Sequence, residues 1–151
     1  MVAGSMVARA RALSERAHAG QVDKAGRPYI AHPARVAAAV AAQRGERDPA
    51  VAVAWLHDVV EDTGCTLEEI EQQFGAGVAA AVGAVTRRAG ELPEEYYHRV
   101  ASNEVARVVK LADIADNTDP LRLAQLSVDE ATRLRGKYAY ARAQLDVQSE
   151  H

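Results

Sequence analysis

Residues 49–63 read PAVAVAWLHDVVEDT, and this stretch decides both the fold class and the chemistry that we expect. Its first part, AVAVAWL, is apolar at consecutive positions, which predicts a helix that is buried on nearly every side. The sequence then changes abruptly to HDVVED, which places one histidine and three carboxylates within six residues. Ionised groups are costly to bury unless they are paired or bind a metal. The stretch therefore predicts a buried helix that carries ligands.

The rest of the chain predicts an all-α fold. Aromatic residues make up 5% of the 151 residues, alanine is very common, and strand-like alternation does not persist anywhere. The length suits one domain over residues 1–151, with a core at about 6–147. The helices that we expect cover residues 6–19, 32–44, 48–62, 67–74, 76–88, 93–102, 104–117 and 128–147.

Three of these helices begin with a recognisable capping residue. Asp48 precedes Pro49, which suits an N-cap followed by proline at the first helical position. Thr66 and Ser127 are each followed three residues later by a glutamate, which is the pattern of a capping box. These caps predict where the third, fourth and last helices start.

Composition excludes several classes of protein. A formal net charge of −3 without a long run of one sign argues against broad nucleic-acid binding. The single cysteine, Cys65, excludes an intramolecular disulfide and a thiolate metal cluster. We find neither a membrane span nor a signal peptide, so the cytoplasm is the expected location. The sequence does not fix the oligomeric state.

Four side chains form the candidate metal site. His57 and Asp58 are adjacent, about 100° apart on an ideal helix, so a metal between helices could touch both. Asp113 falls in a largely apolar helix, and His32 stands at the start of its helix. Each has an ordinary structural explanation when taken singly, but together they follow the order H…HD…D. Two imidazoles and two carboxylates suit Mn²⁺ or another octahedral divalent ion better than structural zinc.

Further polar residues surround these four. Glu61 and Asp62 lie one turn beyond His57 and Asp58, where they could orient a metal-bound water molecule or bind a group next to the ligands without being ligands themselves. Lys24 and Arg27 lie in a Gly/Pro-containing loop before His32, and we weigh a phosphate-binding role against simple solvated loop charges.

Other cations carry weaker signals. Lys110 is three residues before Asp113 on the same face, so it could pair with an acidic residue at the site or reach phosphate. Arg87, Arg88 and Arg122 are most simply interpreted as solvated charges.

Three segments carry a family resemblance. They are GQVDKAGRPYIAHPARVA (20–37), WLHDVVEDT (55–63) and VKLADIADN (109–117). They resemble the hydrolase domain of the RelA/SpoT family, and more closely the small alarmone hydrolases and the metazoan SpoT homologue. The resemblance covers about residues 6–145. It implies an all-α HD fold and a Mn²⁺-dependent hydrolase that removes the 3′-pyrophosphate from (p)ppGpp.

The resemblance also implies roles for individual residues. His32, His57, Asp58 and Asp113 match the metal ligands of the family. Glu61 and Asp62 match the acidic pair that activates water. Lys24 matches a cation near the substrate phosphates, and Asn117 matches an asparagine at the nucleotide pocket.

The sequence departs from the family pattern at two places. Asp23 stands where the family usually has an arginine that packs on the guanine base, and an acidic group cannot supply that cation–π contact. After Asn117 the chain reads TDPLR, which differs from the arginine-containing stretch that is usual in the family. Both departures concern nucleotide recognition and leave the metal site intact.

Three functions therefore remain open. The first is (p)ppGpp 3′-pyrophosphohydrolysis, with a small phosphorylated nucleotide as the partner. The second is an HD-type phosphatase that acts on another nucleotide, such as NADPH or a different purine compound. The third is a non-catalytic nucleotide-sensing or scaffold protein, which would be expected to have lost ligands or the acidic pair.

Overall fold

The computed structural model describes residues 5–149, and it confirms the all-α fold. Within these residues the only extended pairing is an isolated bridge between Val22 and Pro28, in the loop after the first helix. The helices are α1 (Met6–Ala17), α2 (Ala31–Arg44), α3 (Pro49–Leu56), α4 (Val59–Asp62), α5 (Leu67–Phe74), α6 (Ala76–Val85), α7 (Pro93–Ala101), α8 (Glu104–Asn117), α9 (Pro120–Leu123) and α10 (Val128–Ser149).

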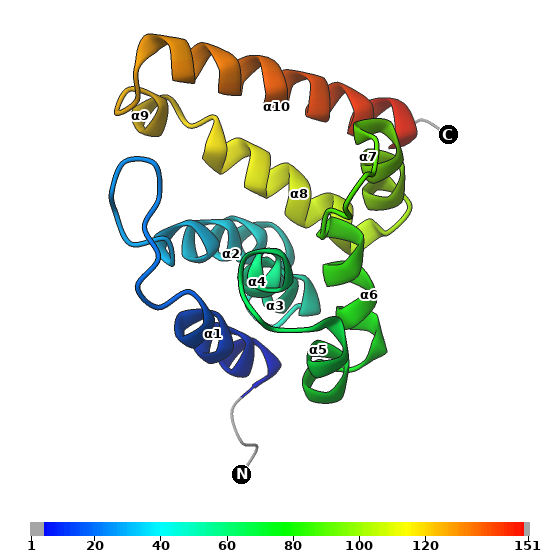
Figure 1. The fold of residues 1–151 in the computed structure, drawn as a ribbon. Coiled ribbons are helices and arrows are strands. Elements are labelled where there is room, and N and C mark those ends of the chain that lie inside the picture. The colour runs from blue at the N-terminus through cyan, green and yellow to red at the C-terminus, as the bar shows by residue number, and fades with distance from the viewer. Residues whose placement is uncertain (1–4, 150–151) are drawn as a thin grey trace.

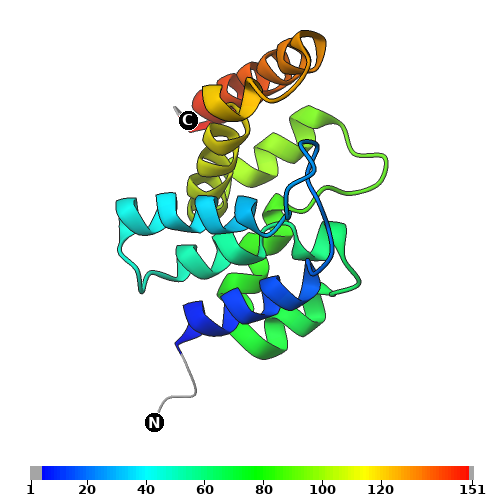
Figure 2. The same ribbon diagram turned by 90° about the vertical axis from the view of Figure 1, so that its left-hand side faces the viewer.

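Helix α3 is the centre of the molecule. Every residue from Ala50 to Leu56 is buried, as the apolar run predicted. Helices α1, α2, α6 and α8 pack against it, and α1, α3 and α2 form a stack (Figures 1 and 2). Because α3 is rich in alanine, its neighbours can approach closely on all sides.

A second layer lies on the C-terminal side. The long helix α10 runs along α8 and also packs on α7 (Figure 1). Tyr96, Tyr97, Ile114 and Leu145 belong to the buried cluster in this part of the molecule. Helix α9, which the sequence did not predict, is a single turn capped by Asp119, and it follows directly after α8.

The predicted caps are confirmed. The Asp48 carboxylate accepts from Ala50 N at 2.8 Å, and the hydroxyl of Thr66 accepts from Glu69 N at 3.2 Å. Ser127 Oγ accepts from the backbone N–H of Glu130 at 3.1 Å. Apart from the third helix, the predicted helix ends agree with the observed ends within three residues.

The predicted third helix is wrong in one respect, because it breaks at His57 and Asp58. The imidazole Nδ1 of His57 donates to the carbonyl oxygen of Ala54 at 2.7 Å. In an uninterrupted helix that carbonyl would accept from the backbone N–H of Asp58. Asp58 instead adopts φ −106° and ψ 0°, outside the ideal helical region, and α4 starts at Val59. The two residues therefore lie on a bend between α3 and α4.

None of the helices in the described part of the chain is long and apolar enough to cross a membrane.

Candidate functional site

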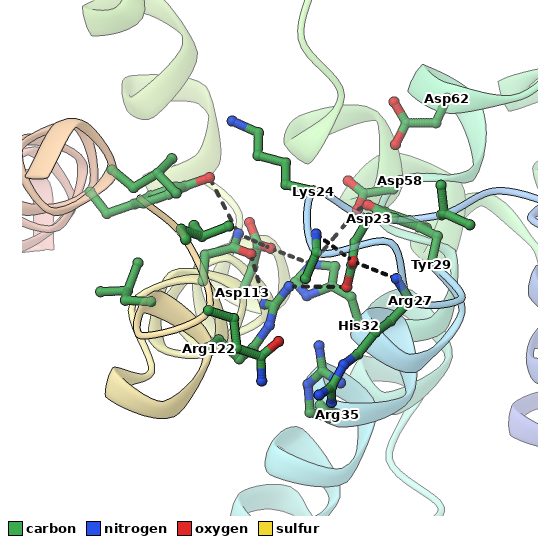
Figure 3. A pocket seen from close by; sticks show the side chains of 18 of the residues that line it. Asp23, Lys24, Arg27, Tyr29, His32, Arg35, Asp58, Asp62, Asp113 and Arg122 are labelled. Atoms are coloured by element: carbon green, nitrogen blue, oxygen red, sulfur yellow. Dashed lines mark hydrogen bonds and ion pairs between the residues drawn. The ribbon is translucent and has the colours of Figure 1, made fainter. Parts of the chain in front are cut away.

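Four side chains from three parts of the fold converge on one point, and Figure 3 shows three of them, His32, Asp58 and Asp113. His32 comes from the first turn of α2, His57 and Asp58 from the bend after α3, and Asp113 from the middle of α8. Nε2 of His32 lies 2.8 Å from Oδ1 of Asp113 and 3.8 Å from Oδ2 of Asp58. Nε2 of His57 lies 3.1 Å from Oδ2 of Asp58 and 3.4 Å from Oδ1 of Asp113.

The bend at His57 explains how this imidazole is aimed. Because a carbonyl oxygen only accepts, the bond to Ala54 fixes the proton on Nδ1 and turns Nε2 toward the carboxylates. That Nε2 atom is buried and makes no well-formed hydrogen bond, although two carboxylate oxygens lie nearby. A buried nitrogen without a hydrogen bond is costly unless something else satisfies it.

Asp113 is held by its own helix. Lys110 Nζ donates to Oδ2 of Asp113 at 2.9 Å, and Asn117 Nδ2 donates to Oδ1 at 3.1 Å. Lys110 is 8% exposed, so this pair is nearly buried, and it confirms that Lys110 pairs with an acidic residue of the site. Asn117 also contacts the hydroxyl of Tyr138 at 3.3 Å and lines the neighbouring pocket.

The pKa values show how strongly the four groups interact. Burial is the largest influence on the pKa of His57 and lowers it, yet Asp58 and Asp113 together raise that pKa well above its ordinary value. Burial likewise raises the pKa of Asp113, but Lys110 and the two histidines hold it well below its usual range. Burial also opposes ionisation of Asp58, and His57 lowers the Asp58 pKa to about 2. The carboxylates of the site therefore favour positive charge beside them, as the raised pKa of the His57 imidazole shows.

The donor set fits a divalent cation. The ligand atoms of His32, His57 and Asp113 all lie within 4.8 Å of one another, and Asp58 Oδ2 lies close to both imidazoles. Imidazole nitrogens together with hard carboxylate oxygens are a usual set for Mn²⁺ and similar ions. The unbonded Nε2 of His57 is the atom that such an ion would satisfy.

The acidic pair lies beside this centre. Glu61 and Asp62 end the short helix α4, and both line the same pocket. Oε1 of Glu61 accepts from the backbone N–H of Arg87 at 2.8 Å, which fixes Glu61 against the segment after α6. Burial is the largest cause of a raised Asp62 pKa, followed by the charges of Asp58 and Glu61. Asp62 therefore accepts a proton more readily than an ordinary aspartate.

A pocket of about 410 Å³ opens at these residues. Eight of the nine predicted site residues line it, and the ninth, His57, contacts Asp58 and Asp113 from behind. Its ionised lining comprises seven basic side chains and five carboxylates, namely Lys24, Arg27, Arg35, Arg87, Lys110, Arg122, Lys137, Asp23, Asp58, Glu61, Asp62 and Asp113. An excess of cations within an acidic chain suits an anionic ligand.

Two of the cations were misjudged from the sequence. Arg87 and Arg122 were interpreted as solvated charges, but both line the pocket. Arg87 stacks over the ring of Tyr96 with its guanidinium carbon 4.2 Å from the ring centroid, and it bonds the hydroxyl of Tyr97. Arg122 belongs to α9, whose single turn gave no periodic signal. The scarce tyrosines near residue 96 were the signal that could have pointed to Arg87.

Part of the pocket wall is apolar, and Val22, Leu123, Leu126, Leu134 and Tyr138 line it. Lys24 spans this region, because its ammonium group pairs with Glu130 on α10. The loop that carries Lys24 is therefore tied to the far side of the pocket.

Asp23 has a structural task in that loop. Its Oδ1 accepts from the backbone N–H groups of Ala25 at 2.9 Å and Arg27 at 3.0 Å, which closes the turn. Its Oδ2 lies 3.8 Å from a guanidinium nitrogen of Arg122. The pocket thus has an acidic group at position 23, with a guanidinium from α9 beside it.

Comparison with known proteins agrees with this fold. The family model described as "HD domain" matches residues 10–135. A solved structure described as "A metazoan ortholog of SpoT hydrolyzes ppGpp and plays a role in starvation responses" has a TM-score of 0.74. The alignment covers 99% of this chain and 94% of that one at 23% identity, which shows a common fold.

Several longer curated proteins are similar in sequence. A guanosine-3′,5′-bis(diphosphate) 3′-pyrophosphohydrolase of Haemophilus influenzae is 36% identical over 132 residues, which are 81% of this chain and 19% of that protein. The bifunctional (p)ppGpp synthase/hydrolase SpoT of Escherichia coli is 34% identical over 131 residues, again 81% of this chain and 18% of the relative. A probable GTP pyrophosphokinase of Mycobacterium leprae is 35% identical over 127 residues, which are 78% of this chain and 16% of that protein. The chain thus spans less than a fifth of the length of these relatives.

Proposed function

The chain belongs to the HD domain family, and from this premise we propose that it is a divalent-metal-dependent phosphohydrolase whose substrate is guanosine 3′,5′-bis(diphosphate) or its triphosphate form. The observation that carries the proposal is the convergence of two imidazoles and two carboxylates at the end of a basic pocket. The activities for which the longer relatives are named supply the substrate. The cytoplasm stays the predicted location.

We assign the metal ligands as His32, His57, Asp58 and Asp113, with Mn²⁺ as the proposed ion. A divalent ion held there would lower the pKa of a water molecule and offset charge on phosphorus. The residues of this chain provide the remaining functions. Lys110 and Asn117 hold the Asp113 carboxylate, and the Ala54 carbonyl holds His57.

Asp62 is the better candidate for the general base. Its raised pKa lets it accept a proton from the attacking water, and it lies at the pocket surface beside Asp58. Glu61, anchored on the backbone of Arg87, positions the water instead. The water oxygen bonds to the phosphorus attached at the 3′ oxygen, and the bond from that phosphorus to the 3′ oxygen breaks. Pyrophosphate leaves, and the 3′ oxygen of the nucleotide takes up a proton.

The pocket walls suit a phosphorylated nucleotide. Lys24, Arg27, Arg87 and Arg122 line the pocket, and we assign them to the phosphate groups of the substrate. The apolar wall that includes Leu123, Leu126 and Leu134 offers a surface for a base or sugar. Asn117 faces the same pocket while it holds Asp113, so it can contact the nucleotide only from that fixed position.

A second candidate is a phosphohydrolase with another nucleotide as substrate, such as NADPH or a different purine compound. The observation that favours it is the use of Asp23 to close the loop, where its negative charge faces Arg122. A carboxylate at this place repels a phosphate and offers no cationic plane for a base. The metal centre would serve either substrate.

The test is the release of pyrophosphate from ppGpp by purified protein, with Mn²⁺ and with a chelator. We expect turnover only with the metal, and none in Asp58→Ala, whose carboxylate lies at the centre of the site. A nucleotide panel assayed in parallel separates the two candidates. Turnover of another nucleotide without ppGpp turnover would select the second candidate. No metal-dependent turnover of any nucleotide would favour a non-catalytic sensor.

A further inference from the structure

A carboxylate outside the proposed ligand set lies directly behind the metal centre. Asp116 follows Asp113 by three residues on α8, and its side chain is 9% exposed. It accepts hydrogen bonds from Nδ1 of His32 at 2.6 Å, Nε of Arg35 at 2.8 Å and Nη1 of Arg122 at 2.7 Å. Three cationic or polar donors from α2 and α9 thus meet on one carboxylate.

The bond to His32 decides which imidazole nitrogen faces the centre. A carboxylate only accepts, so Nδ1 of His32 carries a proton and Nε2 is the atom directed at Asp113 and Asp58. His57 is fixed in the same sense, but by the backbone carbonyl of Ala54. The two imidazoles are therefore aimed by two different acceptors, one of them a backbone group and the other a side chain.

The same carboxylate ties His32 to the pocket wall. Arg122 also donates to the Asp116 carbonyl oxygen at 3.2 Å and to Oδ1 of Asn117 at 3.2 Å. Its guanidinium lies near Asp23 at the pocket mouth. Asp116 consequently joins α2, α8 and α9 at the place where the ligand set meets the pocket.

We propose that Asp116 is a positioning residue, which holds His32 with Nε2 toward the metal and strengthens that nitrogen as a ligand. The proposal rests on the proposed function, because it takes His32 as a metal ligand. An anionic acceptor on the distal nitrogen makes an imidazole a stronger donor and fixes its ring orientation. Ionised Asp116 provides both effects at His32, whereas the Ala54 carbonyl provides only a neutral acceptor at His57.

The experiment compares Asp116→Leu and Asp116→Asn with the unchanged protein. Leucine has a similar volume and no acceptor, whereas asparagine keeps a neutral acceptor for Nδ1. Mn²⁺ binding to each protein is measured from the electron paramagnetic resonance signal of the free ion. We expect the dissociation constant to rise about 10–100-fold in the leucine variant and about 3–10-fold in the asparagine variant.

A matched control distinguishes the positioning of His32 from a general effect of removing one negative charge. Asp23→Asn removes one negative charge from the same pocket and beside the same arginine, but Asp23 does not contact His32. Its Mn²⁺ dissociation constant should stay within about threefold of the original. Since the leucine variant removes a carboxylate that accepts from Arg35 and Arg122, its thermal unfolding is recorded in chelator. If it does not fold, the asparagine variant alone decides.

A spectroscopic readout reports the orientation itself. In the protein loaded with Zn²⁺ as a diamagnetic substitute, long-range ¹H–¹⁵N spectra should show His32 protonated on Nδ1. In the Asp116→Leu variant, His32 should no longer be present only as the tautomer protonated on Nδ1. An unchanged Mn²⁺ affinity in the folded Asp116 variants would overturn the positioning role alone, as would an equal loss in Asp23→Asn. No Mn²⁺ binding by the original protein would overturn the metal site as well.

Discussion

Binding of Mn²⁺ should raise the thermal stability of this protein, and the Asp58→Ala substitution should abolish that gain. The four proposed ligand groups come from α2, the bend after α3, and α8, so they are close together only in the folded chain. An ion that binds only the folded state at 100 times its dissociation constant adds about 2.7 kcal/mol. For a domain of this size each kcal/mol raises Tm by about 2–4 °C, which gives an expected gain of about 5–11 °C.

The assay is thermal unfolding followed by circular dichroism at the helix band, in chelator and then in excess Mn²⁺. Asp58 is the residue to change because its side chain is 19% exposed and has no buried lysine partner, unlike Asp113. The alanine variant should keep its helix content in chelator. Glu104→Gln is the matched control, since it removes the same charge at a surface ion pair with Arg44.

The outcomes are distinct. The control should show the full gain with Mn²⁺, and Asp58→Ala should show almost none. If the alanine variant gains as much as the original protein, the ion binds elsewhere and the proposed ligand set is refuted. If no folded protein responds to Mn²⁺, Co²⁺ or Zn²⁺, the histidine–carboxylate cluster is a structural ion-pair network.

Three substitutions and one change of pH test other parts of the structure. Asp62→Asn should lower kcat about 10²–10⁴-fold, as expected for loss of a general base, with Mn²⁺ affinity little changed. Lys24→Met should raise KM about tenfold with a smaller effect on kcat, because it removes a cation from the pocket; an effect confined to kcat would contradict this role. Asp48→Ala removes the N-cap of α3 and should cost about 1 kcal/mol in the free energy of unfolding, measured in urea. Burial lowers the pKa values of His32 and His57, but the neighbouring carboxylates raise both of them above the ordinary histidine value. In chelator, the stability that the two protonated imidazoles contribute should therefore be fully present below about pH 6.5 and should be lost as the pH rises through the raised pKa values. A free energy of unfolding that does not decrease over that pH range would contradict this prediction.

The parts of the fold that depend on local sequence were predictable. The N-caps at Asp48, Thr66 and Ser127 and the apolar run of α3 are short-range signals, and all were confirmed. The break at His57 was not predictable from helix periodicity, because it depends on one imidazole bonding one carbonyl.

The site was predictable only in part for a similar reason. Eight of the nine candidate residues could be identified from residue type and spacing, and Asn117 was identified only from the family resemblance; the structure brings all nine together. Arg122 was misinterpreted and Asp116 was overlooked, because the importance of both comes from contacts between α2, α8 and α9, which sequence spacing does not show. The pairing of Lys24 with Glu130 joins the loop after α1 to α10, and it was not predictable for the same reason.

The metal-site residues and the basic residues of the pocket come from different parts of the fold, and this affects which of them can be substituted during evolution. The histidines and aspartates of the proposed metal site stand on α2, on the bend after α3 and on α8, which pack around the buried core, where nearly every substitution disturbs packing. Several basic side chains that line the pocket stand on the loop after α1, on α9 and on α10, where replacements cost less stability. For the proposed function, the groups that carry hydrolysis and several of the groups that would recognise the substrate thus lie in different segments, so the second set can be substituted during evolution while the first is retained.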